Sequence, residues 1–166
     1  FPAIDWLLSY SLYTLRLSDW FEGNVSDDWN AMRDETMALL QEESELEEIV
    51  RLVGQDALSV KDRLTLEAAR SIREDYLHQN AFHEVDTYSS PAKQRMMLRL
   101  ILDYGIKAQQ ALENGAEYSK VISLPVREAI GRIKYTPEEE MGDRFEEVSR
   151  QLESEINSLM AQGGLE

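Results

Sequence analysis

The spacing of the apolar residues is the feature that most restricts what this chain can fold into. Near the end of the chain, the apolar positions three or four residues apart are Met141, Phe145, Val148, Leu152, Ile156 and Leu159. That period places side chains on one face of an α-helix, and similar spacing recurs through most of the chain. No stretch shows the alternation of apolar and polar residues that a half-buried strand needs. The sequence therefore predicts an all-α fold, a helical bundle.

Turn and capping residues divide this pattern into separate helices. Ser26, with two aspartates directly behind it, predicts the start of one helix. Ser44 with Glu47 forms a capping-box pattern, which predicts that a short second helix begins there. Gly54 is expected to end that helix, because glycine readily adopts the backbone conformation that follows a last helical turn.

A tight turn is expected directly after Gly54. Ser59 with Asp62 resembles the next cap and predicts a long helix that continues through Tyr76. Since few residues separate the helices on either side of the turn, we expect them to be antiparallel. They would form a protruding helix-turn-helix with an exposed tip.

Further helices are expected to begin at Ser90, at Pro125 and at Thr136. The first of them would end at Gly115. Residues 79–88, with the sequence QNAFHEVDTY, interrupt the helical pattern and combine two aromatic residues, two amides and a histidine. This loop is the stretch whose chemistry most needs an explanation.

At 166 residues the chain is long enough for one domain with a sizeable core. It opens with FPAIDW, without an initiator methionine or a signal-peptide pattern, so we interpret it as a piece of a longer protein. We expect residues 1–25 to be a leading segment that enters the bundle. Residues 26–162 would form the helical bundle, and residues 163–166 a tail or a remnant of cloning.

Composition excludes several classes of function. The net charge of −15 argues against binding to nucleic acid or to an anionic lipid surface, since both favour basic patches. No apolar run approaches the roughly 20 residues that span a bilayer, so we predict no membrane insertion. The chain has no cysteine, which excludes disulfides, thiolate metal sites and a cysteine nucleophile.

The residues offer no local catalytic pattern. No glycine cluster precedes a lysine and a serine or threonine, as a phosphate-cradling loop requires, and no nucleophile elbow is present. His78 and His83, with Glu84 and Asp86 nearby, do not have the spacing of a standard metal site. We predict no metal site and no catalytic residue in this chain, and expect His83, Glu84 and Asp86 to face solvent.

Three ordered stretches carry a resemblance to a known family. They are FPAIDWLLSYSLY, EEIVRLVGQDALSVKDRLTLEAARSIREDYLHQNAFHEVDTY and ISLPVREAIGRIKY. Together they resemble the C-terminal region of the catalytic subunit of rotary ATPases. The match is closest to the A subunit, or alpha chain, of archaeal A-type and related V-type ATP synthases. The resemblance covers the chain up to about Tyr135, and implies a C-terminal helical bundle preceded by a nucleotide-binding domain.

The resemblance implies a nucleotide site shared between two domains. In this family the central domain holds the phosphates of ATP or ADP and the magnesium ion, and the C-terminal domain closes over the adenine with aromatic side chains. Phe1, Phe82 and Tyr88 match those aromatic positions. Gln79 and Asn80 would contact the edge of the base or only hold the loop. The other interpretation is that Phe82 and Tyr88 anchor the loop onto the bundle.

The second implied site is the tip of the helix-turn-helix, which in F-type relatives meets the rotating central stalk. The corresponding residues here are Asp56, Ala57, Leu58, Ser59, Val60, Lys61 and Asp62. Because Ala57, Val60 and Lys61 replace acids of the F-type motif, an apolar contact is expected rather than an electrostatic one. Leu58 and Val60 would make that contact, unless they turn inward and cap the turn.

The resemblance also implies an assembly. The full subunit would alternate with B subunits in an A/B hexamer and couple ATP synthesis or hydrolysis to proton or sodium transport. It would be cytoplasmic and lie peripherally on the cytoplasmic face of the cell membrane. This piece alone is expected to be inactive and to bind no cofactor firmly. The alternative function is a stand-alone acidic helical adaptor that binds other proteins and has no role with nucleotides.

Overall fold

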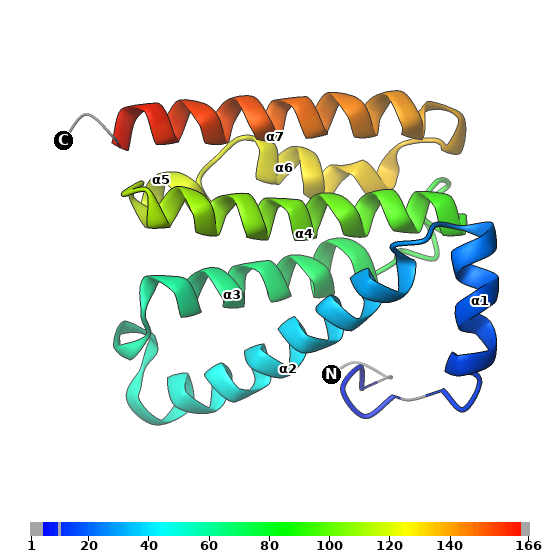
Figure 1. Ribbon diagram of the computed structural model, residues 1–166, viewed down its shortest axis with the longest axis horizontal. Helices are drawn as coiled ribbons and strands as arrows, with labels where there is room; N and C mark the ends of the chain where they lie inside the picture. The colour runs from blue at the N-terminus through cyan, green and yellow to red at the C-terminus, as the bar shows by residue number, and fades with distance from the viewer. Residues whose placement is uncertain (1–4, 10, 164–166) are drawn as a thin grey trace.

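The computed structural model describes residues 5–9 and 11–163, the last two by their backbone alone. Phe1 and most of the expected tail therefore lie outside the described residues. The helices are α1 (Thr14–Asn24), α2 (Trp29–Val53), α3 (Val60–Ser71), α4 (Pro91–Glu113), α5 (Tyr118–Ile122), α6 (Val126–Arg132) and α7 (Met141–Gly163). Throughout the described residues there is no strand, so the prediction of an all-α fold is confirmed (Figure 1).

The long helices α3, α4 and α7 lie side by side, with α4 in the middle (Figure 1). The second helix, α2, packs on α3 and runs obliquely to it, while α5 and α6 lie beside α4 and α7. The first helix, α1, packs on α2 and stands across one end of the bundle. It contributes no buried side chain to the core.

The core is centred on α4. Leu100, Ile101 and Leu102 are consecutive and all buried, which requires that α4 be enclosed on more than one side. Burying each such side chain stabilises the fold by roughly 1.5–3 kcal/mol. The apolar face predicted for the last helix is confirmed, since Met141, Val148, Leu152, Ile156 and Leu159 are buried and Phe145 packs against the core. These two faces account for much of the interior.

One prediction about the helix boundaries was wrong. No helix begins at Ser44, because α2 runs without interruption from Trp29 to Val53. Its buried face continues through this region at helical spacing, with Leu40, Glu43 and Leu46 all packed inward. Continuous packing on α3 therefore outweighs the local capping pattern at this position.

The start of α2 also differs in detail from the prediction. The residue that precedes the helix is Asp28, and its side chain does not cap the backbone. Its carboxylate instead accepts hydrogen bonds from Nε and Nη2 of Arg95 in α4, at 2.8 and 2.7 Å. An acid expected to stabilise one helix locally thus ties two helices together.

The turn between α2 and α3 is formed as predicted. Gly54 ends α2 with φ +87°, a conformation that favours glycine, and a short 3-10 turn covers Gln55–Ala57. Ser59 and Asp62 then form a reciprocal capping box, in which each side chain accepts from the other residue's backbone N–H, at 3.1 and 3.2 Å. The two helices are antiparallel and their shared end projects from the bundle, which confirms the protruding helix-turn-helix (Figure 1).

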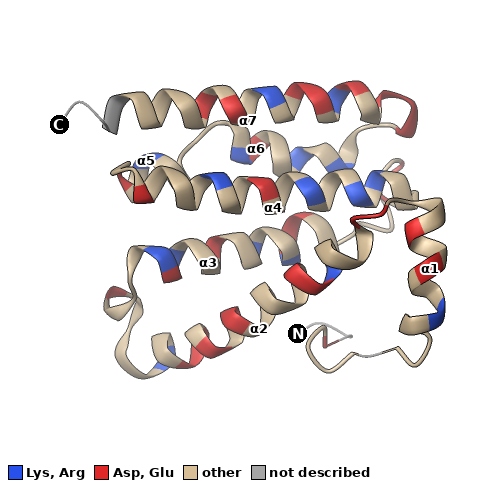
Figure 2. Ribbon diagram, in the orientation of Figure 1, with Lys and Arg blue, Asp and Glu red and all other residues tan. Residues whose placement is uncertain are grey.

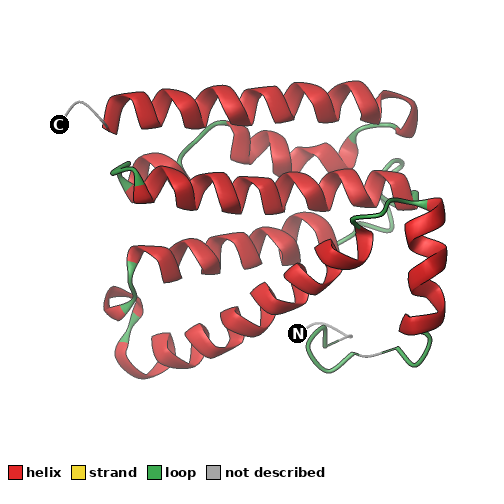
Figure 3. Cartoon of the chain, in the orientation of Figure 1, coloured by secondary structure: helices red, strands yellow, loops and turns green. Residues whose placement is uncertain are grey.

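A π-helix over Ile72–Leu77 follows α3 and leads into the loop that precedes α4. Figure 3 shows this loop at the end of the bundle where α1 also lies. Ser90 caps α4 by accepting from the Lys93 backbone N–H at 3.1 Å, and Pro91 occupies the first helical position. This helix start was predicted correctly.

The later part of the chain contains one helix that the sequence did not predict, the short α5. The next helix, α6, follows Pro125 as expected. The last helix begins at Met141, because the residues after Pro137 first form a 3-10 turn over Glu138–Glu140. A further 3-10 turn, Ile133–Tyr135, connects α6 to this region.

Charged residues lie along the outer faces of the helices, and acids recur along α2 and α7 (Figure 2). They alternate there with the buried apolar face, as expected of solvated helix surfaces. Among the described residues, no helix combines the length and the apolar character that crossing a bilayer requires.

Candidate functional site

The loop between the π-helix and α4, residues 78–90, presents two aromatic rings to solvent. Phe82 is 100% exposed and Tyr88 is 67% exposed. Neither ring packs into the bundle, so the interpretation that they anchor the loop is wrong. Burial of such rings normally contributes a few kcal/mol to folding. Left uncovered, both remain available to a ligand or to another part of the full protein.

Hydrogen bonds between its own residues give this loop a defined shape. The Asp86 carboxylate is buried and accepts from the backbone N–H of Asn80 at 2.7 Å. The side-chain oxygen of Asn80 in turn accepts from the Phe82 N–H at 3.0 Å. His83 Nδ1 accepts from the N–H groups of Val85 and Asp86 at 3.1 and 3.2 Å. Because charged and ring acceptors hold successive backbone groups, the loop is ordered by its own residues.

The expectation that His83, Glu84 and Asp86 face solvent is therefore confirmed only for Glu84, which is exposed. His83 is half-buried, and Asp86 is buried. The reason is that the loop folds back on itself, so that the Asp86 carboxylate replaces water as the partner of a backbone group six positions earlier. Nothing in the sequence around Asp86 indicated this burial, because an acidic residue in a loop is normally exposed.

A hollow of about 180 Å³ lies at the foot of the loop. Its lining residues are Tyr76, Leu77, Gln79, Asp86, Ser89, Gln94 and Met97. Burial raises the pKa of Tyr76 to about 12, so its hydroxyl stays protonated at any physiological pH. The hollow is smaller than the roughly 300–1,000 Å³ typical of complete ligand pockets, so it would supply only part of a site.

The two amide residues of the loop differ in position. Gln79 lines the hollow and is exposed, which leaves its side chain available for a polar contact. Asn80 is also exposed, but its side-chain oxygen is engaged with the Phe82 N–H. The structure thus brings Gln79 to the hollow and assigns Asn80 to holding the loop.

The leading segment comes close to the foot of the same loop. Trp6 shares a second, mostly apolar pocket of about 290 Å³ with Tyr76 and Leu77 of the π-helix and with Trp29 and Leu40 of α2. Phe1, the third aromatic residue of the predicted pocket, lies outside the described residues. The described part of the segment nonetheless lies beside the π-helix that carries the loop.

At the tip of the helix-turn-helix, the predicted residues divide into structural and exposed ones. Ser59 and Asp62 form the capping box, and the Asp56 carbonyl accepts from Arg63 at 3.3 Å. Leu58 is buried, so it caps the turn internally as the second interpretation held. Ala57, Val60 and Lys61 are exposed.

Further apolar residues at the tip were not singled out in the sequence. Leu52 is 83% exposed and Val53 is 65% exposed, in the last turn of α2. With Ile49 and Val60, both about half exposed, they form what we call the tip patch. The sequence did contain a signal for the tip patch. Apolar residues continue to the very end of the predicted helix, past its last buried position, Leu46.

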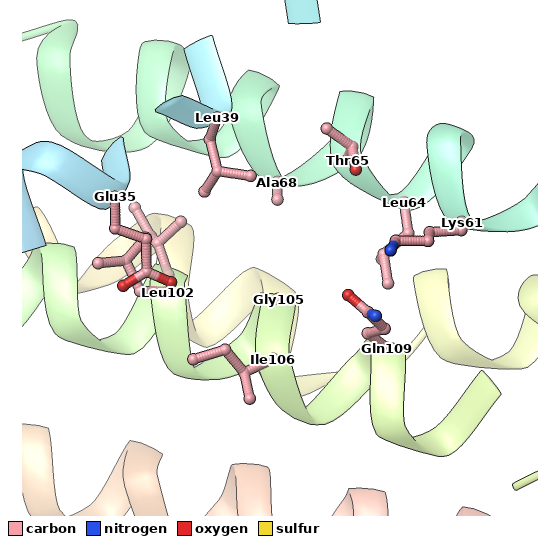
Figure 4. A pocket seen from close by; sticks show the side chains of 11 residues that line it. Glu35, Leu39, Lys61, Leu64, Thr65, Ala68, Leu102, Gly105, Ile106 and Gln109 are labelled. Carbon is pink, nitrogen blue, oxygen red and sulfur yellow. The ribbon is translucent and has the colours of Figure 1, made fainter. Parts of the chain in front are cut away.

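A groove lies between α2, α3 and α4, away from the loop (Figure 4). Glu35 stands at one end of it, and Lys61 and Gln109 stand at the other, with aliphatic side chains between them. Its volume is about 110 Å³, well below that of a typical ligand pocket. The groove brings together no set of groups that could act on a substrate.

The described residues also contain no group of three or more histidine, aspartate or glutamate side chains placed to hold a metal ion. The candidate site reduces to the exposed rings of the loop, the hollow at its foot and the tip patch.

Comparison with known proteins gives these features a context. The model of the family described as the C-terminal domain of V and A type ATP synthase matches residues 18–122. That range includes most of α1, all of α2 to α5, the tip and the whole of the loop.

Curated relatives agree with the family match. The chain is 58% identical over 161 residues to the V-type ATP synthase alpha chain of Acetivibrio thermocellus, covering 97% of this chain and 27% of the relative. It is 56% identical to that of Clostridium perfringens over 99% of this chain and 28% of the relative. It is 55% identical to that of Thermoanaerobacter pseudethanolicus, over 98% of this chain and 28% of the relative.

The chain spans just over a quarter of the length of these relatives. All three organisms are bacteria, whereas the sequence resemblance pointed first to archaeal enzymes. The chain belongs to the family of C-terminal domains of V-type and A-type ATP synthase alpha chains.

Proposed function

We propose that this domain closes over the adenine of ATP or ADP in the full-length alpha chain and passes the resulting motion to the central stalk. The observation that carries the proposal is the exposure of Phe82 and Tyr88 on a loop whose backbone is held by hydrogen bonds to its own side chains. Flat rings suit a purine, because base-aromatic stacking contributes roughly 1–3 kcal/mol per base. The polar side chain of Gln79 would meet the edge of the base.

The remaining chemistry belongs to other parts of the subunit. This chain offers no phosphate-cradling loop in its sequence, and its described residues contain no cluster of three or more histidine or acidic side chains that could hold a metal ion. We therefore expect the isolated domain to show no ATP hydrolysis and only weak binding of adenine nucleotides. Phosphates and magnesium would be held by the domain that precedes it in the full subunit.

An ion pair links α2 to the π-helix that leads into the loop. Arg73, in the π-helix just before the loop, donates from Nε and Nη2 to the Glu43 carboxylate in α2, at 2.7–3.1 Å. The acceptor is almost fully buried, so this paired geometry is far more rigid than a surface ion pair. A displacement of the loop would thereby move α2 and the tip patch with it.

The tip patch would then meet the central stalk by apolar contact. The 25 residues of α2 give it a length of roughly 37 Å, enough to convert a small rotation of the domain into a displacement of several ångströms at the tip. A stalk orientation that favours the closed domain must also favour bound nucleotide, because the coupling is reciprocal.

In the assembly we propose, the full subunit alternates with B subunits in a hexamer on the cytoplasmic face of the cell membrane. Proton or sodium transport would take place in other subunits. A stand-alone acidic adaptor, the alternative left open by the sequence, has no observation in its favour once the chain belongs to this family.

Replacement of Phe82 in the full-length, assembled enzyme tests the adenine role. We expect Phe82→Ala to raise the Kd for ATP and for ADP roughly 5- to 150-fold, since it removes one stacking surface. Phe82→Trp serves as the matched control, because it keeps a flat ring and should retain most of the affinity. Nucleotide binding is measured by equilibrium titration. Equal affinities for wild type and Phe82→Ala would remove the ring from the pocket.

A further inference from the structure

Two buried lysines stand out among the side chains that the proposed function does not use. Lys93, in the first turn of α4, is 1% exposed, and Lys134, in the 3-10 turn Ile133–Tyr135, is 7% exposed. Burying an ammonium group is costly unless it finds partners. Among the described residues, neither lysine has a carboxylate within ion-pair distance. Their partners are backbone carbonyls instead.

Lys134 holds the end of the π-helix. Its Nζ donates to the carbonyl oxygens of Glu74 and His78, at 2.9 and 3.2 Å. Carbonyls at the end of a helix lack partners within the helix and carry partial negative charge, so a cation there is well placed. The bond to His78 fixes the residue at which the loop begins.

Lys93 holds Lys134 from the other side. Its Nζ donates to the carbonyl oxygens of Lys134 and Thr136, at 2.9 and 2.7 Å. Burial lowers the pKa of Lys93. Since Lys93 follows the end of the loop and Lys134 contacts its beginning, both ends of the loop are tied to one short segment of the chain.

The same segment touches the loop at two further places. The ring of Tyr135 lies against that of His83 in the middle of the loop, with 4.5 Å between ring centres. The Glu138 carboxylate accepts from the backbone N–H and the hydroxyl of Ser90, at 2.9 and 2.7 Å. Residues 134–138 therefore contact the beginning, the middle and the end of the loop, although they lie more than 40 positions away in the sequence.

We propose that Lys134, supported by Lys93, is a positioning residue for nucleotide binding, which holds the loop so that Phe82 stands ready for the base. This inference rests on the proposed function. A lysine suits the task because its three donors can serve several carbonyls at an irregular helix end. Methionine has a similar length and no donors, and so it would leave those carbonyls without partners.

The test compares Lys134→Met with wild type in the full-length, assembled enzyme. We expect the KM for ATP to rise roughly tenfold while kcat changes less than about twofold, since only the placement of the loop is lost. Lys120→Met is the matched control: Lys120 pairs with Glu117 on the exposed surface, and its loss should leave both constants unchanged. An unchanged KM in Lys134→Met would overturn the inference.

A double variant separates this inference from the proposed function. If Lys134 acts by placing the ring of Phe82, Lys134→Met should raise the KM much less in a Phe82→Ala background than in wild type. An equal rise in both backgrounds would contradict the positioning role. If Phe82→Ala alone leaves the KM unchanged, the proposed function fails and the inference falls with it. If Phe82→Ala raises the KM and Lys134→Met does not, only the inference fails.

A second variant and a second measurement guard against simple misfolding. Tyr135→Leu removes the contact with His83 at a half-exposed position and should raise the KM in the same direction by a smaller factor. Hydrogen exchange should show faster exchange across residues 79–88 in Lys134→Met than in Lys120→Met, with the protection of α4 and α7 preserved. Unchanged exchange in the loop would show that Lys134 does not hold it.

Discussion

Ion pairs between distant residues hold neighbouring helices of this domain together. Asp28 and Arg95 join the start of α2 to α4, and the two hydrogen bonds from the guanidinium lower the pKa of the Asp28 carboxyl from 3.8 to about 2. Because the folded-state pKa lies below its ordinary value, the pair stabilises the fold fully above about pH 5. This contribution is lost as the pH falls towards 2.

The variant Asp28→Asn tests that contribution. At pH 7 we expect the free energy of unfolding to fall by roughly 1–2 kcal/mol, a value discounted because the pair is partly exposed. The difference from wild type should shrink as the pH is lowered towards 3. Urea unfolding followed by circular dichroism at both pH values measures it. The control is Asp34→Asn, which breaks the exposed pair with Arg33 and should change the free energy of unfolding little. If Asp28→Asn lowers the free energy of unfolding equally at both pH values, the Asp28 carboxylate is not the group responsible.

At the scale of single elements, α2 and α3 show when a local pattern decides a helix boundary. The capping box of Ser59 and Asp62 was predictable, since its hydrogen bonds span only three positions and a turn with Gly54 precedes it. The same pattern at Ser44 and Glu47 was misleading, because the buried face of α2 continues through it. A cap forms where packing permits the helix to end.

Removal of the cap should therefore be measurable. We expect Ser59→Ala to lower the free energy of unfolding by about 1 kcal/mol and to fray the first turn of α3. Chemical denaturation reports the first effect, and amide exchange at residues 60–63 reports the second. Ser158→Ala provides the control, because the hydroxyl of Ser158 only donates a hydrogen bond to the carbonyl of Ser154 within α7. If Ser59→Ala is as stable as Ser158→Ala, the capping box does not stabilise α3.

At the scale of the whole molecule, the loop and the tip patch lie at different ends of one α2–α3 hairpin. Substitution of Leu52 and Val53 by serine should leave the fold intact, because both side chains are exposed. In the assembled enzyme we expect ion transport per ATP hydrolysed to fall several-fold, since the proposed contact of the tip patch with the stalk would be weakened. The measurement is the ratio of pumping to hydrolysis in reconstituted vesicles.

The control for this prediction lies in the same turn. Leu58 is buried, so Leu58→Ser should destabilise the domain by roughly 2–5 kcal/mol and not uncouple a correctly folded enzyme. If the double variant at Leu52 and Val53 pumps with unchanged efficiency, the tip patch is not the contact with the stalk.

The sequence predicted the fold class, but little of what holds the loop in place. Helical periodicity and caps are local, so they can be read from neighbouring residues. The contacts of Lys134 with Glu74 and His78 join positions 60 and 56 residues apart, and nothing near Lys134 in the sequence indicates them. The buried state of Asp86 likewise depends on how the loop closes. Phe1 stays a prediction, as it lies outside the described residues.

The enclosure of α4 limits how this domain can deform. With neighbours against several of its faces, α4 has no direction in which it can slide or bend without opening the interior. Its 23 residues make it roughly 34 Å long, so it behaves as a stiff rod set in the middle of the structure. The domain should therefore swing as one solid body, without internal rearrangement of its helices.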